Sequence, residues 1–301
     1  SRAAGLEDEA RLVEVLRGIR VVLHAAGPFS ETSAPMVAAC LRAGVHYLDV
    51  TGEVDVFESL ARRHQEARRR GIMLLPGAGY DVVTTDCLAA HVTRRLPGAR
   101  KLSIGIAGLR FMSPASAKAF LGYAGRGVTV RRAGALVEVA PGSERLFDFD
   151  GRLLWGINVS LPDVVSAHHT TGIAEIAGYY EATPAMRSVV NTWRYLGGLV
   201  GAPWMRPAAE AWSGLLWRGP TMEERERSPT VIVAEAEDAL GRRAASRLHT
   251  PEPYSTTAAT AAAIAERVLA GDAESGFETP ARPFGPDFAL SFEGVQREDL
   301  Y

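Results

Sequence analysis

Short apolar runs alternate with amphipathic stretches over the first hundred residues of this chain. The runs at 20–26, 46–51 and 72–76 each end in small or polar residues and lead into a helix-like pattern. This order is typical of a doubly wound parallel α/β sheet. Ligands of such sheets lie outside the carboxyl ends of the strands. We therefore expect the functional site at the turns 27–30, 51–53 and 77–81.

The stretches around these runs carry apolar residues with helical spacing. They predict helices over 6–17, 33–42, 54–70 and 85–95. Ser33 has the side chain of an N-cap, and Gly44 stands just past the end of the same helix.

The pattern changes after Pro97. It predicts a strand at 101–107 and a short helix at 114–123, and Gly-punctuated apolar runs from 134 to 180 favour antiparallel strands. Residues 186–217 are helical and aromatic-rich, 230–237 and 242–249 form a hairpin, and 256–270 form an Ala-rich helix. We expect the tail from 276 to lie as an ordered arm over the surface.

Together these elements predict an α/β protein with two domains. Residues 1–97 form a Rossmann-type doubly wound sheet, and residues 98–249 form an α+β domain with an antiparallel sheet. Residues 250–301 supply a helix and an arm that return to the first domain.

Composition narrows the possible functions only slightly. The chain has 301 residues, of which 47% are hydrophobic and 23% charged, as in ordinary globular proteins. A net charge of −2 gives no reason to expect a nucleic acid partner. We see no secretory signal and no apolar run of membrane length, and we expect a cytoplasmic protein. Cys40 and Cys87 are expected to be buried free thiols, with no metal site.

The turn at 77–81 resembles a Gly-rich phosphate loop but departs from it. Gly77 and Gly79 follow a strand, yet Val82 stands where the third glycine belongs, and no acidic residue closes a second strand about 20 residues later. One interpretation is a tight turn that uses glycine for positive φ. The other is a close backbone approach to a cofactor or substrate, flanked by Asp81 and Asp86.

The other two turns leave similar alternatives open. Gly27, Pro28 and Phe29 form either a loop whose phenylalanine caps the core or a backbone surface with a ring that stacks on a flat ligand. Thr51 and Gly52 precede Glu53, which is either the acid at a helix N-terminus or a polar group facing the crevice.

The second domain contains further polar candidates. His168, His169 and Thr170 lie in a segment that we interpret as a strand, where adjacent side chains point to opposite faces and make poor joint metal ligands. One histidine could face a cleft as an acid, a base or a carboxylate binder; otherwise both are partly buried and hydrogen-bonded. Tyr179 and Tyr180 are core or rim residues, or one of them donates a proton.

Four tryptophans gather in one stretch with several leucines. They favour a dimer interface or a buried helical layer, and the alternative is an apolar channel or a membrane-surface face for a lipid-like substrate. The residues are Trp193, Trp204, Trp212 and Trp217.

Five ordered stretches carry a resemblance to a known family. They are 21–53, 71–99, 166–173, 257–280 and 284–300, and they include the segments GPFSE, YLDVTGE, PGAGYD and AHHTTG. In these stretches the chain resembles the saccharopine dehydrogenase-like oxidoreductases, most closely their bacterial branch of trans-acting enoyl reductases. The resemblance implies an NAD(P)-binding Rossmann domain joined to an α+β domain for substrate binding and dimerisation.

The resemblance also implies roles for individual residues. It sets Gly27, Pro28 and Phe29 beside the nicotinamide, with Thr51, Gly52 and Glu53 opposite. The residues that it assigns to the substrate are Gly77, Tyr80, Asp81, His168, His169 and Thr170. Tyr80, His169 and Glu53 are the candidates for the group that supplies or orients a proton.

One departure from the family is large. Its members open with a strand, a Gly-rich turn, a helix and a second strand, whereas this chain opens with an amphipathic helix. We expect an N-terminally incomplete Rossmann unit that has lost most of its cofactor affinity and exposes an apolar sheet edge.

The leading hypothesis is an NADP- or NAD-dependent oxidoreductase. Hydride would pass to an activated C=C (enoyl) or C=N bond of a small or acyl substrate held between the domains of a homodimeric protein. The alternative is a redox-inactive relative that binds a small molecule, or catalyses a non-redox reaction, in the same cleft. A third hypothesis is a protein that contacts lipid through the Trp-rich helices.

Overall fold

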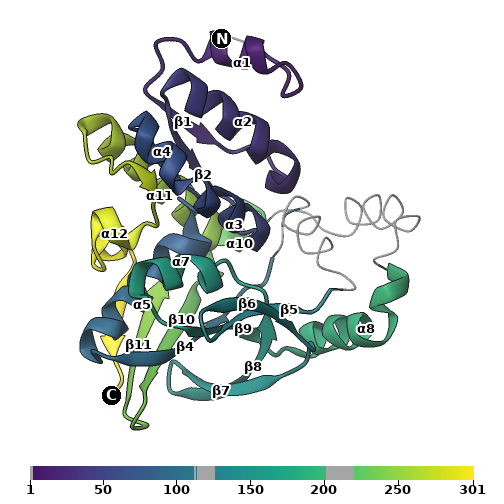
Figure 1. Cartoon of the computed structure of the whole chain (residues 1–301). Coiled ribbons are helices and arrows are strands. Elements are labelled where there is room, and N and C mark those ends of the chain that lie inside the picture. The colour runs from purple at the N-terminus through teal and green to yellow at the C-terminus, as the bar shows by residue number, and fades with distance from the viewer. Residues whose placement is uncertain (1–2, 112, 114–125, 201–219) are drawn as a thin grey trace.

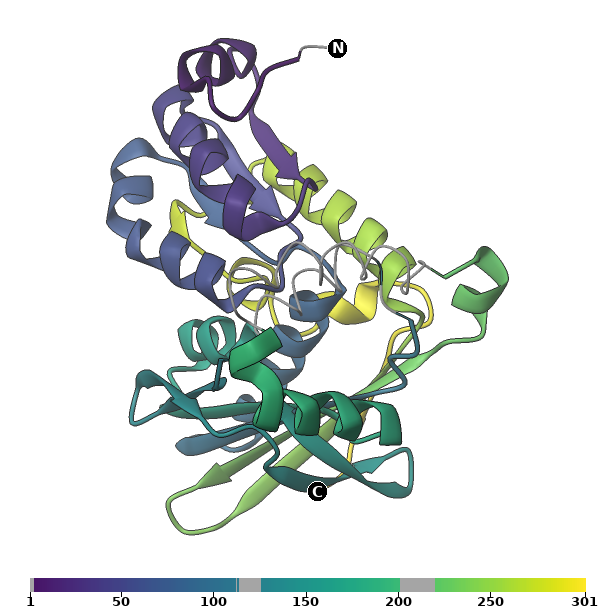
Figure 2. The ribbon, with the colours of Figure 1, turned by 90° about the vertical axis from the view of Figure 1, so that its right-hand side faces the viewer.

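The computed structural model describes residues 3–111, 113, 126–200 and 220–301. Two β-sheets lie one above the other, and helices cover the outer faces of the upper sheet (Figures 1 and 2). The N-terminus lies beyond the upper sheet and the C-terminus at the lower one (Figure 1). The predicted α/β class is confirmed.

The upper sheet has four parallel strands. They are β1 (Val21–His24), β2 (His46–Asp49), β3 (Met73–Leu75) and β12 (Gly276–Phe277), in that order across the sheet. In register, Val21 lies beside His46 and Gly276 beside Met73. The tail was predicted as a surface arm, and for β12 that prediction is wrong. A two-residue strand is too short to leave an alternating pattern.

Helices of this upper layer begin and end at slightly different residues from those expected. They are α1 (Glu9–Val15), α2 (Phe29–Ala43), α3 (Val54–Arg62), α4 (His64–Arg70), α5 (Tyr80–Arg95) and α11 (Pro253–Ala270). Ser33 is not the N-cap of α2 but a buried residue inside it, because the helix begins directly after Pro28. The predicted helix 54–70 is two helices, because Arg63 leaves the α conformation.

Helix α5 starts five residues earlier than its sequence predicts. Its first turns carry Thr84 and Thr85, which favour loops because their hydroxyls compete for backbone hydrogen bonds. Here both hydroxyls donate within the helix, Thr84 to the Tyr80 carbonyl (2.7 Å) and Thr85 to the Asp81 carbonyl (2.8 Å). The polar residues are thereby satisfied inside the helix.

Within the described residues the lower sheet has nine strands. Its main order is β13 (Gln296–Asp299), β11 (Arg243–Thr250), β10 (Thr230–Asp238), β4 (Ala99–Ala107), β9 (Glu175–Glu181), β5 (Val128–Arg132) and β6 (Ala135–Val139). The hairpin of β7 (Glu144–Phe149) and β8 (Arg152–Val159) joins β9. The predicted hairpin of β10 and β11 is confirmed, whereas β9 also pairs in parallel with β4, which the antiparallel prediction missed.

Helix α7 (Asp163–Thr171) corrects the prediction that His168 and His169 lie on a strand. It ends at Gly172, which has the left-handed conformation of a helix C-cap. Further elements are α8 (Pro184–Val200), α10 (Met222–Glu226), α12 (Ala281–Phe284) and a 3₁₀ turn (Phe288–Ser291). The predicted helix 114–123 and the residues Trp204, Trp212 and Trp217 lie outside the described residues.

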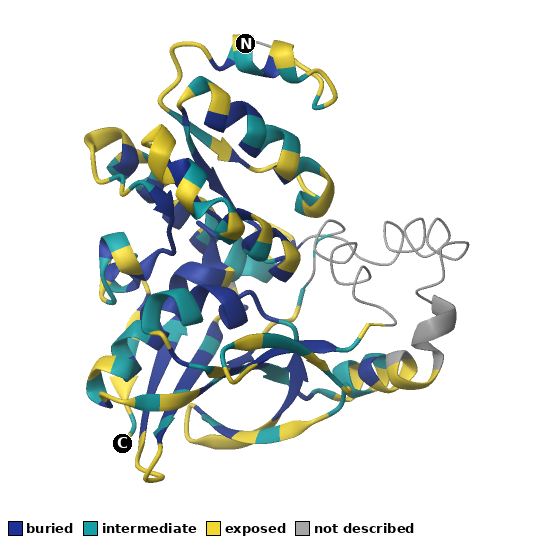
Figure 3. Cartoon of the chain, viewed as in Figure 1, coloured by how far each residue is buried: buried dark blue, intermediate teal, exposed yellow. Residues whose placement is uncertain are grey.

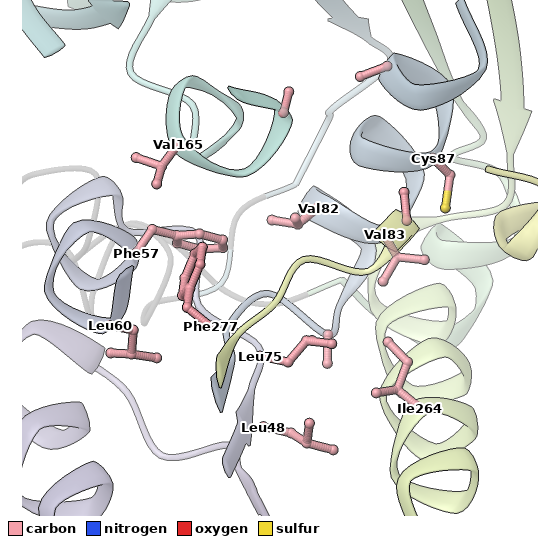
Figure 4. Packing of buried hydrophobic residues seen from close by; sticks show 14 of the residues in the cluster. Leu48, Phe57, Leu60, Leu75, Val82, Val83, Cys87, Val165, Ile264 and Phe277 are labelled. Atoms are coloured by element: carbon pink, nitrogen blue, oxygen red, sulfur yellow. The ribbon is translucent and has the colours of Figure 1, made fainter. Parts of the chain in front are cut away.

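One apolar core runs through both layers. Helices α5 and α7 lie between the sheets, in the region drawn as buried in Figure 3. Phe57 of α3 meets Phe277 of β12 edge to face, with ring centroids 6.5 Å apart, close to Val165 of α7 (Figure 4). Cys40 and Cys87 are buried free thiols, as predicted. This shared apolar core fixes the upper sheet against the lower one.

Strand β1 is the open edge of the upper sheet. Within the described residues it pairs only with β2, and Leu23 and the neighbouring Ile19 are exposed. The exposed apolar edge that the sequence predicts is therefore present. No helix in the described ranges combines the length and apolar character needed to cross a membrane.

Candidate functional site

Three turns meet at the carboxyl ends of β1, β2 and β3, as the sequence predicts. They are held together by the side chains of β2 and of the turn that follows it. Glu53 reaches the turn after β1, and Asp49 reaches the turn after β3. The two contacts fix the spacing of all three turns.

Glu53 ties its turn to the N-terminus of α2. Its Oε1 accepts from the Phe29 N–H (2.8 Å) and its Oε2 from the Ser30 N–H (3.1 Å). The carboxylate is buried, and it satisfies two of the donors that a helix start leaves free. Glu53 is the N-cap residue of α3 but makes no side-chain bond to that helix, and its carboxylate lies instead at the N-terminus of α2.

Asp49, which the sequence analysis did not single out, is the central polar group of this edge. Its Oδ1 accepts from the backbone N–H groups of Thr51 (2.9 Å) and Gly77 (3.0 Å), and its Oδ2 accepts from the Tyr47 hydroxyl (2.8 Å). The Tyr47 hydroxyl also lies 3.1 Å from His24 Nδ1. Burial raises the pKa of Asp49 to about 6, although these hydrogen bonds oppose the shift. The signal in the sequence was an aspartate closing an otherwise buried strand.

The side chain of Asp81 is an exposed carboxylate at this site. It lies in the first turn of α5, and its Oδ2 would be 3.3 Å from a Cβ built on Gly52. The side chain is open to solvent, yet protein surrounds it closely on its other sides. This loss of hydration raises its pKa to about 6. A carboxyl group of this kind can hold or give up a proton near neutral pH.

The glycines of the three turns differ in what they allow. A Cβ on Gly27 would meet only the Phe29 ring at 3.4 Å, and one on Gly52 only the Asp81 carboxylate. A Cβ on Gly77 or Gly79 would instead collide with side chains of the core and of α11. Gly27 and Gly52 thus leave open backbone to which a flat group can approach, whereas Gly77 and Gly79 serve internal packing.

Tyr80 is buried rather than open to the site. Its hydroxyl lies 2.7 Å from Thr230 Oγ1 on β10, and its backbone N–H donates to Thr257 of α11. Burial is the main cause that raises its pKa. Tyr80 therefore joins β10 of the lower sheet to α11.

The histidine segment lies at the end of α7, among residues of the C-terminal tail. His168 Nδ1 lies 2.7 Å from the Ile173 carbonyl. His169 Nε2 lies 3.1 Å from the Phe277 carbonyl and 2.6 Å from the Arg282 guanidinium. Burial and the positive charge of Arg282 lower the pKa of His169 to about 4, so its ring is neutral at physiological pH.

The remaining predicted polar residues of the site have internal partners as well. Thr51 is buried, and its hydroxyl accepts from the Glu53 N–H (3.1 Å). Thr170 donates to Asp86 (2.7 Å), and burial raises the pKa of Asp86 to about 6. Among the described residues no cluster of three or more His, Cys, Asp or Glu side chains has the arrangement of a metal site.

A cleft of about 700 Å³ opens beside the site, between α3 and the β5–β6 hairpin. Val54, the residue after Glu53, is one of the residues that line this cleft. Two ion pairs link its walls: Arg126 lies 2.8 Å from Asp55, and Arg131 lies 3.7 Å from Glu58. The cleft is therefore polar and of mixed charge.

Comparisons with known proteins agree with the resemblance seen in the sequence. Residues 2–75 match the family model of the saccharopine dehydrogenase NADP binding domain. A trans-acting enoyl reductase of Mycobacterium ulcerans is 32% identical over 93 residues, which cover 31% of this chain and 22% of the relative. A saccharopine dehydrogenase-like oxidoreductase of Mus musculus is 26% identical over 94 residues, with the same coverage.

The fold extends the likeness beyond these matched residues. The apo structure of saccharopine dehydrogenase (L-Glu forming) from Saccharomyces cerevisiae aligns with 99% of this chain and 88% of its own, with a TM-score of 0.59 and 12% identity. The predicted resemblance is confirmed. The sequence matches span only about a fifth of the length of these curated relatives.

Proposed function

Proceeding from the match to an NADP-binding domain, we propose that this chain belongs to a nicotinamide-dependent oxidoreductase. The nicotinamide end of NADPH or NADH would lie at the carboxyl edge of the upper sheet. When bound, that cofactor supplies a hydride for an activated C=C or C=N bond of a small or acyl substrate.

The observation that carries the proposal is the uncovered backbone of Gly27 and of Gly52, and the space beside these two glycines is called the opening below. Both glycines leave backbone free of side chains, and a Cβ at either position would reduce that space. Asp49 and Glu53 hold the turns on both sides of the opening through hydrogen bonds to backbone N–H groups. Such preorganisation suits a flat ring whose position relative to the substrate must be fixed to within about half an ångström.

Phe29, Pro28 and Thr51 would complete the cofactor side of the opening. The Phe29 ring lies next to Gly27 and packs edge to face on His24, with ring centroids 5.4 Å apart. It would stack against one face of the nicotinamide, while Pro28 and Thr51 keep their turns in place.

Asp81 would supply the proton on the substrate side. Reduction of C=C or C=N adds a hydride to one atom and a proton to its neighbour, so an acid is required opposite the hydride donor. Asp81 faces Gly52, is accessible, and has a pKa raised to about 6. A carboxylate there also favours a substrate with a cationic or hydrogen-donating group, such as a protonated imine.

The proton-transfer roles predicted for Tyr80, Glu53 and His169 remain predictions, as do the substrate contacts of Gly77, His168 and Thr170. All three candidate acids have internal hydrogen-bond partners in the structure. This geometry favours Asp81 as the acid and Glu53 as a residue that orients the turn. The homodimer and the cytoplasmic location are likewise proposals carried by the resemblance.

The experiment is a turnover assay that follows oxidation of NADPH and NADH with enoyl thioesters and cyclic imines. We expect Asp81→Asn to lower kcat at least tenfold and Glu293→Gln, which removes an exposed carboxylate just before β13, to leave it unchanged. Equal rates for Asp81→Asn and the unmodified protein would refute the role of Asp81. Binding of a small molecule in the cleft without any nicotinamide dependence would support the redox-inactive alternative instead.

A further inference from the structure

His24 is a buried histidine that the proposed reaction does not use. It is the last residue of β1, directly before the exposed residues 25–27. Its ring packs edge to face on two others, those of Phe29 and Tyr47, with centroids 5.4 Å and 5.9 Å away. Phe29 is the ring that we propose to stack on the nicotinamide. His24 therefore connects that ring to the interior of the sheet.

Tyr47 determines which nitrogen of His24 carries a hydrogen. The Tyr47 hydroxyl donates its one proton to Asp49 Oδ2 (2.8 Å). It can therefore only accept from His24 Nδ1, which lies 3.1 Å away. A neutral imidazole has a single N–H, and the bond made by the ring decides which nitrogen holds it. The geometry assigns this hydrogen to Nδ1.

The charge states of both ends agree with this direction of donation at pH 8. Burial lowers the pKa of His24 and outweighs the Ala26 carbonyl, which favours the protonated ring, so the imidazole is neutral. The pKa of Asp49 is about 6, so its carboxyl group is ionised and accepts. Glu53, the other carboxylate near Asp49, is occupied by backbone N–H groups of α2. Donation thus runs from His24 to Tyr47 to Asp49.

The far end of this chain is anchored in the other two turns. Asp49 Oδ1 accepts from the backbone N–H groups of Thr51 (2.9 Å) and Gly77 (3.0 Å). The chain therefore extends from the turns after β2 and β3 to the ring of His24, which contacts Phe29 in the turn after β1. It is a second connection among the three turns, separate from the bonds of Glu53.

We propose that His24 is a positioning residue, which holds the ring of Phe29 on the nicotinamide side of the opening through its chain to Tyr47 and Asp49. The bond at Nδ1 fixes the rotation of the imidazole, and an imidazole with a fixed edge keeps Phe29 in one orientation. The inference deepens the proposed function and rests on it for the role of Phe29 in cofactor binding. The chain itself is a property of the protein without cofactor.

The first test is nitrogen-15 NMR of the histidine rings at pH 8 without cofactor, with His24 assigned from its loss in His24→Phe. We expect the hydrogen on Nδ1. Asp49→Asn presents an NH₂ group to Tyr47, whose hydroxyl then turns to His24, so the hydrogen should move to Nε2. A hydrogen on Nε2 in the unmodified protein, or on the same nitrogen in both proteins, would overturn the chain.

The second test is a fluorescence titration with NADPH. His24→Phe keeps an aromatic edge against Phe29 but loses the Nδ1–H, and we expect at least fivefold weaker binding. In a Phe29→Leu background the same change should weaken binding less than twofold, because His24 acts through that ring. An equal effect of His24→Phe in both backgrounds, or no effect in either, would overturn the positioning role.

His46→Phe is the matched control for this titration. His46 is the first residue of β2, at the edge of the sheet away from the turns, and its Nδ1 accepts from the Met73 N–H (2.9 Å). Its replacement also removes a histidine hydrogen bond within the upper sheet, so we expect a lower melting temperature but unchanged NADPH affinity. Weaker NADPH binding by His46→Phe, to the same degree as by His24→Phe, would reduce His24 to a structural role.

A readout without cofactor separates this inference from the proposed function. Nuclear Overhauser effects between the rings of His24 and Phe29 should weaken in Tyr47→Phe, which keeps the ring of residue 47 but leaves Nδ1 without its partner. Unchanged effects would overturn the positioning role, whatever the NADPH affinity. If they weaken as expected but the unmodified protein binds no NADPH, the proposed function fails and the positioning of Phe29 stands.

Discussion

Replacing Asp49 tests whether the site is held together as described. The carboxylate accepts three buried hydrogen bonds, two from backbone N–H groups and one from the Tyr47 hydroxyl. Asp49→Asn keeps an amide oxygen for Thr51 and Gly77 and presents its NH₂ group to Tyr47, whose oxygen can accept. Asp49→Ala leaves the backbone N–H groups of Thr51 and Gly77 without a partner, whereas the Tyr47 hydroxyl still lies within reach of His24 Nδ1.

Because both variants are uncharged at position 49, their difference isolates the hydrogen bonds. An unsatisfied buried donor costs about 1–3 kcal/mol, and two of them in the lower part of that range give about 2–4 kcal/mol. We expect the free energy of unfolding of Asp49→Ala to lie below that of Asp49→Asn by this amount. Equilibrium unfolding in urea, followed by circular dichroism, measures it.

In the unmodified protein the free energy of unfolding should also depend on pH, because Asp49 titrates. The pKa of Asp49 is about 6 in the folded chain and its ordinary value is 3.8, so the folded state binds more protons between these values. Stability relative to Asp49→Asn should therefore fall as pH rises from 4 to 8, by about 3 kcal/mol for the shift of roughly two units. Equal stability of the Ala and Asn variants, within about 1 kcal/mol, would refute the reasoning.

Three further predictions address neighbouring groups. Glu53→Ala should lower the free energy of unfolding by about 1–2 kcal/mol through loss of the two bonds to the start of α2, and Glu53→Gln by less; urea unfolding of both variants would show it, and equal losses would contradict it. Asp163→Asn should remove a loss of stability of about 4 kcal/mol between pH 4 and 8, since burial raises the pKa of Asp163 from its ordinary 3.8 to about 7; thermal melts across that range would show an unchanged slope if the acid is not buried in solution. Tyr80→Phe should cost about 1 kcal/mol of stability through the lost contact with Thr230 and change kcat by less than threefold, whereas a large fall in kcat without loss of stability would restore Tyr80 as the proton donor.

The sequence predicted the parallel sheet and its three turns because each strand ends where its apolar run ends. The turns 27–30, 51–53 and 77–81 do meet at one edge, as the rule for carboxyl ends requires. Strand β12 escaped prediction because two residues carry no period, and its partner Met73 lies some two hundred residues earlier. Long-range pairing of this kind leaves no local signal.

The polar residues of the site were harder to assign than its backbone. Asp49 lies inside the strand that the sequence predicts at 46–51, and its role appears only when the turn at Gly77 lies beside it. The sequence predicts a strand at His168 and His169 because the apolar runs from 134 to 180 are short and Gly-punctuated, whereas the structure has a helix there that ends at Gly172. In each case the residue type indicated which side chains could transfer a proton or bind a ligand. The fold then determined which of them have internal hydrogen-bond partners and which do not.

The most direct test of the account is a fluorescence titration of the protein with NADPH, compared with Gly52→Val. The valine side chain would fill the opening beside Asp81, where even a Cβ comes within 3.3 Å of the carboxylate, while the core stays untouched. We predict saturable NADPH binding by the unmodified protein, at least tenfold weaker binding by Gly52→Val, and melting temperatures that agree closely. Equal NADPH affinity of the two proteins, or no binding by the unmodified protein, would contradict a nicotinamide site at this edge of the sheet.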